Sequence, residues 1–295
     1  MFAHEPDIVV NGPFPSYYTL WHKLGAWSLQ VGAWLVLFFL ILPILVIVPL
    51  SFNAEPFFSF TQGMLTFDPE AYSLRWYAAI VENENWMLAI QNSFLVGIFA
   101  TIIATALGTL AAVGLASPYM PFKRAIMALL LSPMIVPLII IAAGMFFFYT
   151  KFNLAGSYLG LIVAHAALGI PFVIITVTAT LAGFDRSLYF AGLSLGASPI
   201  KTFFSVVAPL IRPGVISGAM FAFVTSFDEV VVVLFLAGPG QRTIPRQMFS
   251  GLREQINPTI LAVATLLILV SVLFLVTLEL LRRRSERLRG LEAVQ

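Results

Sequence analysis

Two adjacent carboxylates, Asp228 and Glu229, interrupt an otherwise apolar stretch of the 295-residue chain. An acid at the centre of a membrane-spanning helix costs about 2.5–3.5 kcal/mol, so acids found there usually line a pathway or pair with a partner. Neighbouring residues of a helix point about 100° apart, so both side chains cannot face lipid cheaply. Two interpretations remain open: Asp228 meets a cationic solute in a pathway, or the pair has a structural role, such as capping a broken helix. The candidate pathway residues are Asp228, Glu229, Ser226 and Thr225.

Motifs for catalysis are missing or misplaced. Residues 192–196 read G-x-S-x-G around Ser194, with Asp185 and His165 as conceivable partners. A nucleophile elbow needs a strand before the serine and a helix after it, whereas this match lies between two apolar stretches. The chain has no cysteine, three histidines, no H-E-x-x-H and no G-x-x-x-x-G-K-[ST]. The sequence therefore predicts no enzyme active site, no metal site and no nucleotide site.

The distribution of charge predicts the fold class. Charged residues make up 10% of the chain and apolar residues 60%, and the charges gather in short blocks between long apolar runs. Soluble domains average about 25% charged residues, and a helix needs about 20 mostly apolar residues to cross a membrane. We predict an all-α integral membrane protein with six spans, at 31–51, 90–116, 124–149, 158–183, 213–236 and 259–281. Prolines within three of them predict kinks or breaks.

Lysine and arginine set the predicted orientation, because cytoplasmic loops carry an excess of both. With the N-terminus inside, 11 of the 16 basic residues fall on the cytoplasmic side. We therefore predict cytoplasmic termini, with an N-terminal segment at 1–30, a transmembrane domain at 31–281 and a basic tail at 282–295. Three bases on the outer side do not fit this rule, and we interpret them as contacts for an outside partner: Arg242, Arg246 and Arg253.

The inner loop at 184–212 carries the signals for two short helices. Asp185 suits the N-cap of the first, Gly196 breaks it, and Ser198 followed by Pro199 begins the second. Pro209 is expected to end the second helix. The loop has more apolar side chains than a solvated linker needs, and such a surface usually fits a partner's groove. These side chains are Leu188, Phe190, Leu193, Phe203 and Phe204.

This loop resembles the cytoplasmic signature of bacterial ABC-importer permeases, which reads E-A-A, three residues, glycine, nine residues, I-x-L-P. Ala191, Gly196 and Pro209 agree with it in kind and spacing. Phe190 stands in place of the glutamate and Gly192 in place of the second alanine. The resemblance implies coupling helices that seat in separate ATPase subunits. The implied coupling residues are Phe190, Ala191, Gly192, Ser194, Gly196, Ala197, Ser198, Pro199 and Pro209.

Other stretches resemble the spermidine/putrescine permease group, namely S-L-R-W-Y at 73–77, Asn92 with Ser93, S-F-D-E-V at 226–230 and G-P at 238–239. The resemblance implies a type I ABC importer permease in the bacterial inner membrane, transporting a small cation such as a polyamine. It also implies no cofactor in this chain, with ATP and magnesium bound by two ATPase subunits. The further implied partners are a second permease, forming a heterodimer, and a periplasmic solute-binding protein.

Alternatives to this function remain open. Importer permeases for opines, amino-acid derivatives or another small solute share much of the pattern. From a different class, a stand-alone secondary transporter or channel is the alternative, although such proteins typically contain inverted repeats and no convincing internal repeat is present.

Four smaller features have predictions of their own. Residues 73–82 are expected to form an amphipathic helix, lying either on the bilayer surface or against a partner. Gln91 and Asn92 are explained by interfacial solvation. His165 is expected to form a hydrogen bond between helices, and the G-x-x-x-G at 214–218 predicts close helix packing.

Overall fold

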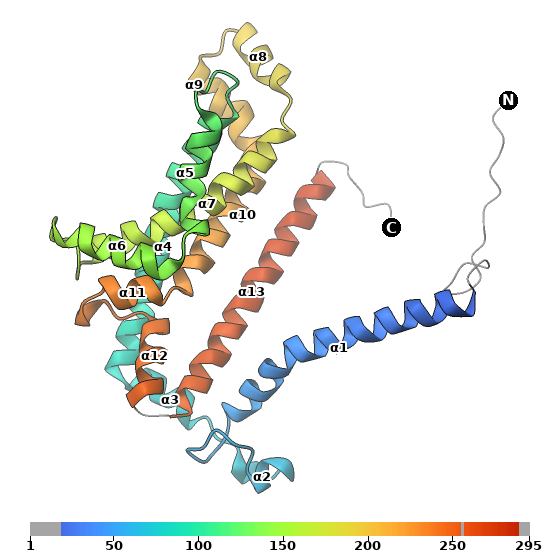
Figure 1. Cartoon of the computed structure of the whole chain (residues 1–295), viewed down its shortest axis with the longest axis vertical. Coiled ribbons are helices and arrows are strands. Elements are labelled where there is room, and N and C mark those ends of the chain that lie inside the picture. Colours follow the sequence, from blue (N-terminus) through green and yellow to red (C-terminus); the bar gives the residue numbers. More distant parts are fainter. Residues whose placement is uncertain (1–18, 255–256, 289–295) are drawn as a thin grey trace.

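The computed structural model describes residues 19–254 and 257–288, which are almost entirely helical (Figure 1). Within them the one strand-like pairing is an isolated bridge between Asn53 and Tyr72. Parts of the predicted N-terminal segment (1–30) and basic tail (282–295) lie outside the described residues. The α-helices are α1 (Leu20–Leu50), α2 (Gln62–Leu65), α3 (Arg75–Glu82), α4 (Glu84–Ala116), α5 (Lys123–Ile135), α6 (Leu138–Thr150), α7 (Tyr158–Ala182), α8 (Arg186–Ser194), α9 (Pro199–Thr202), α10 (Ala208–Phe227), α11 (Val231–Leu236), α12 (Ile244–Glu254) and α13 (Thr259–Leu288).

The described helices support six membrane spans. Five are long and apolar enough to cross alone: α1, α4, α7, the continuous run Pro199–Phe227 and the first part of α13. The sixth is the pair α5 and α6, which bend by 103° at their junction. The bend falls at Val136, whose extended backbone follows from the proline at 137, because a proline disfavours helical backbone in the residue before it.

Two predicted spans therefore need correction. The span expected at 124–149 is broken into two helices, and the one expected at 213–236 is interrupted after Phe227, with α11 following a short break. The short helix α11 packs against α6 in one buried cluster, which includes Ala142 and Tyr149 from α6 and Val232 and Val233 from α11. In Figure 1 both short helices lie across the bundle at mid-height. The two broken spans thus support each other.

The centre of the bundle is formed by α4, α7 and α10, which contact one another along their lengths. Small residues allow this approach. A Cβ added to Gly108 would lie 2.6 Å from Cβ of Val173, and one added to Gly218 would lie 2.9 Å from Cα of Val173. Gly214 faces the side chain of Thr180 in the same way. The predicted close packing at 214–218 is confirmed, and in lipid such contact is a main source of helix association.

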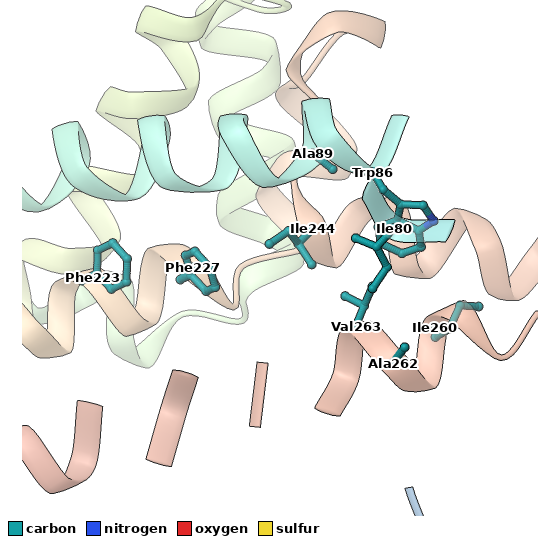
Figure 2. Packing of buried hydrophobic residues seen from close by; sticks show 9 residues of the cluster. All are labelled: Ile80, Trp86, Ala89, Phe223, Phe227, Ile244, Ile260, Ala262 and Val263. Carbon is teal, nitrogen blue, oxygen red and sulfur yellow. The ribbon is translucent and has the colours of Figure 1, made fainter. Parts of the chain in front are cut away.

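The two ends of the bundle differ. Figure 1 shows α8 and α9 at one end and α2, α3 and α12 at the other, with α13 running between the two ends. The α3 end is closed by an apolar cluster that joins Ile80 of α3, Trp86 of α4, Ile244 of α12 and Ile260 of α13 (Figure 2). This arrangement agrees with the prediction that 73–82 and 184–212 lie on opposite sides of a membrane.

The helix α3 confirms the amphipathic helix expected near 73–82, but its apolar face packs within the chain. Ile80 is buried. The indole N–H of Trp76 donates to the Asn53 carbonyl at 2.7 Å, and the Tyr77 hydroxyl is hydrogen-bonded to Ser51 Oγ at 2.7 Å. These contacts attach α3 to the end of α1, so neither the bilayer nor a partner is needed to explain the apolar face.

The first helix leaves the bundle almost completely (Figure 1). Leu50, at its last residue, is the one buried residue of α1, which otherwise exposes large apolar side chains on all sides. A helix that is apolar all round belongs in lipid or among other apolar helices.

Candidate functional site

The helices α8 and α9 form a bent pair, residues 186–202, which we call the knob. Asp185 caps α8, since its two carboxylate oxygens accept from the Ser187 N–H at 2.9 Å and the Ser187 hydroxyl at 2.7 Å. Gly196 has φ +84°, a left-handed backbone that favours glycine, and the chain turns there. Ser198 caps α9 by accepting from the Lys201 N–H. The predicted caps and break are confirmed.

The knob is held together by one close contact and one tether. A Cβ added to Gly192 would lie 2.8 Å from Cγ2 of Thr202, so the absence of a side chain lets α8 and α9 touch. Thr202 is buried in this contact. The Arg186 guanidinium donates to the Ala116 carbonyl at the end of α4. The two hydrogen bonds from Ser187 lower the pKa of Asp185 below its ordinary value, so the α8 cap is ionised at neutral pH.

Pro209 does not end the second helix, as the sequence had suggested. A turn of π-helix, Phe203–Val207, follows α9, and the helix continues through Pro209 to Phe227. The Ala208 N–H bonds to the Phe203 carbonyl, five residues back. Proline has no N–H and its ring clashes with the carbonyl four residues earlier. The wider π-turn before Pro209 accommodates that clash, so the proline shapes the base of the knob and α10 begins without a break.

The outer surface of the knob is apolar. Four large side chains on it are exposed: Phe190 by 60%, Leu195 by 89%, Ile200 by 72% and Phe204 by 67%. Leu188 is also exposed, as predicted. Leu193 and Phe203 are half-buried instead, and Phe203 packs against the core cluster beneath.

The implied coupling residues divide by position. Phe190, Ala191, Ser194, Gly196, Ser198 and Pro199 are exposed on the knob, Ala197 is half-buried, Gly192 faces Thr202, and Pro209 lies at the base in α10.

The break between α10 and α11 separates the two acids that attracted attention in the sequence. Asp228 is exposed at the end of α10, and Glu229 is only 7% exposed. Glu229 Oε1 accepts the N–H of Val232 at 2.7 Å, which caps the N-terminus of α11. This geometry matches the structural interpretation for Glu229, capping a broken helix. It leaves Asp228 as the acid that faces open space.

Ser226 and Thr225 also differ. Ser226 is buried, and its hydroxyl is hydrogen-bonded to Nδ1 of His165 on α7 at 2.8 Å. The predicted bond between helices for His165 is confirmed, and Ser226 is the partner. Nε2 of the same ring is buried without a hydrogen-bond partner among the described residues. Thr225 is half-buried. Across the described part of the chain, no three His, Asp or Glu side chains are grouped so as to hold a metal ion.

Asn92 has a structural role that sequence reasoning missed. Its side-chain amide donates to the carbonyls of Gly240 and Arg242, at 2.9 and 2.8 Å, and its oxygen accepts from the Tyr158 hydroxyl at 2.9 Å. The neighbouring Ser93 hydroxyl accepts from the Ile244 N–H. Solvation at a membrane interface does not explain Asn92, because the residue is buried. A signal existed: two adjacent polar residues opening an apolar helix next to a glycine-rich loop region.

The three outer arginines do not act alike. The Arg246 guanidinium donates to the carbonyls of Ala237 and Gly238, at 3.0 and 2.8 Å, and so satisfies the C-terminal end of α11. Arg242 donates to the Gln247 side chain. Arg253 alone of the three is exposed. The structure therefore gives Arg246 an internal task, which accounts for a base on the side where the loop rule did not expect one.

An apolar bundle with up to six spans, two of them broken near mid-height, and a protruding helical knob at one end defines a multi-pass membrane permease. The chain belongs to the family of binding-protein-dependent transport system inner membrane components, whose model matches residues 104–287. It is a permease subunit of the bacterial inner membrane, as the resemblance at the loop had implied.

Relatives and solved structures agree with this assignment. The spermidine/putrescine transport system permease protein PotC of Escherichia coli strain K12 is 29% identical over 83% of this chain and 90% of PotC. The putrescine transport system permease protein PotI of the same strain is 31% identical over 78% of this chain and 82% of PotI. A bacterial ABC transporter that imports the acidic polysaccharide alginate has the same fold, with TM-score 0.68, 14% identity, and coverage of 90% of this chain and 99% of that one. The expected type I ABC importer permease fold is confirmed.

Proposed function

We propose that this permease carries a polyamine and is driven by separate ATPase subunits that bind the knob. One observation carries the coupling proposal: four large apolar side chains protrude at the end of the bundle opposite α3 and α12. Exposed apolar patches of this kind mark protein interaction sites. Support for the solute comes from relatives named as spermidine/putrescine and putrescine permeases, which align over most of their length.

The proposed mechanism is mechanical, and no bond is made or broken in this chain. Closure of the ATPases on ATP and magnesium moves the knob, and the continuous helix from Pro199 to Phe227 carries that movement to the α10–α11 break. No cofactor is bound by this chain. The knob and both termini face the cytoplasm in this proposal, and α3 and α12 face a periplasmic solute-binding protein, with the exposed Arg253 as its contact.

A second permease completes the pathway. The splayed α1 supports this part of the proposal, since a helix that packs almost nowhere within its own chain is available to a neighbour. Of the four candidate pathway residues, Asp228 is proposed to face the solute and Thr225 to flank it. Ser226 and Glu229 are proposed to hold the shape of the pathway from behind, through His165 and Val232.

The test is co-purification of the ATPase with the full chain expressed together with its transport partners. Leu195→Asp should reduce the co-purified ATPase by about tenfold, because it places a charge in a desolvated contact. The matched control is Leu65→Asp in α2, an equally apolar and exposed site at the opposite end of the bundle. Equal retention of the ATPase by both variants would exclude the knob as its binding site.

A further inference from the structure

A cavity of about 150 Å³ lies between α10 and α13, beside the end of α10. Its wall combines three aromatic rings, Phe223, Phe227 and Phe274, with the carboxylate of Asp228 and the hydroxyl of Ser271. The remaining lining is aliphatic. The described part of the chain has a second, larger cavity, lined mainly by amide side chains at the α3 end, but it holds no ionisable group. Only the α10–α13 cavity joins a charge to aromatic faces.

The aromatic part of this wall is rigid. The rings of Phe223 and Phe227 stack with their centroids 5.2 Å apart, and Phe274 of α13 lies 5.1 Å from Phe223. Figure 2 shows Phe223 and Phe227 on successive turns of α10. Phe94 of α4 packs edge-on against Phe227 at 5.2 Å. Rings held in this way present fixed faces and edges to whatever enters the cavity.

The acidic part of the wall is uncommitted. Among the described residues, no hydrogen bond or salt bridge engages the Asp228 carboxylate, whereas its neighbour Glu229 caps α11. An acid within the apolar stretch of a membrane protein is costly unless a cation or hydrogen-bond donor faces it. Lipid tails supply neither. The carboxylate therefore points to a positively charged occupant.

We propose that this cavity binds one end of a linear alkylammonium ion. Asp228 accepts hydrogen bonds from the ammonium group and Ser271 accepts another. The phenylalanine rings cover the methylene groups and attract the charge through their π faces. This inference rests on the proposed polyamine function and names the residues that would recognise such a solute. Its chemistry selects for a thin chain with a terminal charge, because the walls offer one carboxylate and otherwise only apolar surface.

Uptake of labelled 1,4-diaminobutane by membrane vesicles that contain the complete importer tests the site. Asp228→Asn should lower uptake at subsaturating diamine by about tenfold or more, because it removes the charge partner. Phe227→Leu should raise the apparent KM several-fold while the maximal rate changes little, since a leucine has no π face. The controls are Asp68→Asn, which retains a capping oxygen in an exposed outer turn, and Phe221→Leu, an exposed ring on the same helix.

A third variant keeps the test decisive if Asp228→Asn fails to assemble. Asp228→Glu retains the charge but extends it by one methylene group into the cavity, so the relative uptake of 1,4-diaminobutane over 1,5-diaminopentane should rise. An unchanged KM in Phe227→Leu together with an unchanged diamine preference in Asp228→Glu would overturn the site. Absence of diamine uptake by the unmodified importer would instead overturn the proposed polyamine function.

Discussion

The knob and the α10–α11 break are both interruptions of helix capped by a carboxylate, but they lie in opposite surroundings. At the knob the cap, Asp185, is exposed and the neighbouring side chains that protrude are apolar. At the break the cap, Glu229, is buried among apolar helices. The comparison shows that the same local device serves two purposes: it shapes a contact surface in water, and it permits a change of direction where water is absent.

The energetic weight of the two caps should differ, because water can replace a lost hydrogen bond at the knob but cannot reach the break. An unsatisfied buried N–H costs about 1–3 kcal/mol, and a solvated one much less. Stability measurements on single variants at each position can therefore break or sharpen the comparison.

The largest effect is expected from Glu229→Leu. This change leaves the Val232 N–H buried without its acceptor and should lower the free energy of unfolding by about 1–3 kcal/mol. The measurement is thermal unfolding of the purified chain in nanodiscs. Glu229→Gln keeps an acceptor oxygen and serves as the control, so a similar loss in both variants would contradict a capping role.

A smaller loss is expected from Gly192→Val in the knob. The new side chain would meet Thr202, and overpacking costs at least about 1 kcal/mol, here at the low end because two short helices can separate. The effect on ATPase co-purification should exceed the effect on stability, since the shape of the knob changes. Gly144→Val on α6, where a Cβ meets nothing within 4 Å, is the matched control. Equal co-purification by both variants would show that the contact with Thr202 does not set the shape.

The smallest effect is expected at Asp185, and it depends on pH. The hydrogen bonds from Ser187 lower the pKa of Asp185 in the folded chain, so its contribution is present above the ordinary aspartate pKa and is lost as the pH falls through the lowered value. Hydrogen-exchange protection of α8, corrected for intrinsic rates, should therefore decrease in acid. Asp185→Asn cannot ionise but can still cap, so this variant should lack the pH dependence. A persistent acid-induced loss in Asp185→Asn would assign the effect to another group.

Much of the fold follows from short stretches of sequence. Six apolar runs predict six spans because the hydrocarbon core excludes unpaired backbone groups, which leaves helix as the choice for each run. The caps at Asp185 and Ser198, and the turn at Gly196, were predictable because each depends on residues within three or four positions. The broken third span was half-predictable from the proline at 137.

Other features were not predictable in this way. Asn92 bonds to carbonyls about 150 residues away, and Glu229 differs from Asp228 only because helices distant in the sequence enclose one and not the other. Pro209 was expected to stop a helix, but the π-turn before it removed the clash. In each case the deciding contact was absent from the local sequence.

The sequence by itself determined the class of protein, the number of spans and the presence of a bent apolar loop, since these depend on composition and on neighbouring residues. Tertiary structure alone decided that α6 and α11 support each other, that α3 packs inward and that Asp228 shares a cavity with three aromatic rings. The physical reason is that burial and hydrogen-bond partners are properties of the assembled helices. A residue's type limits what it can do, and its neighbours in space decide which of those possibilities is used.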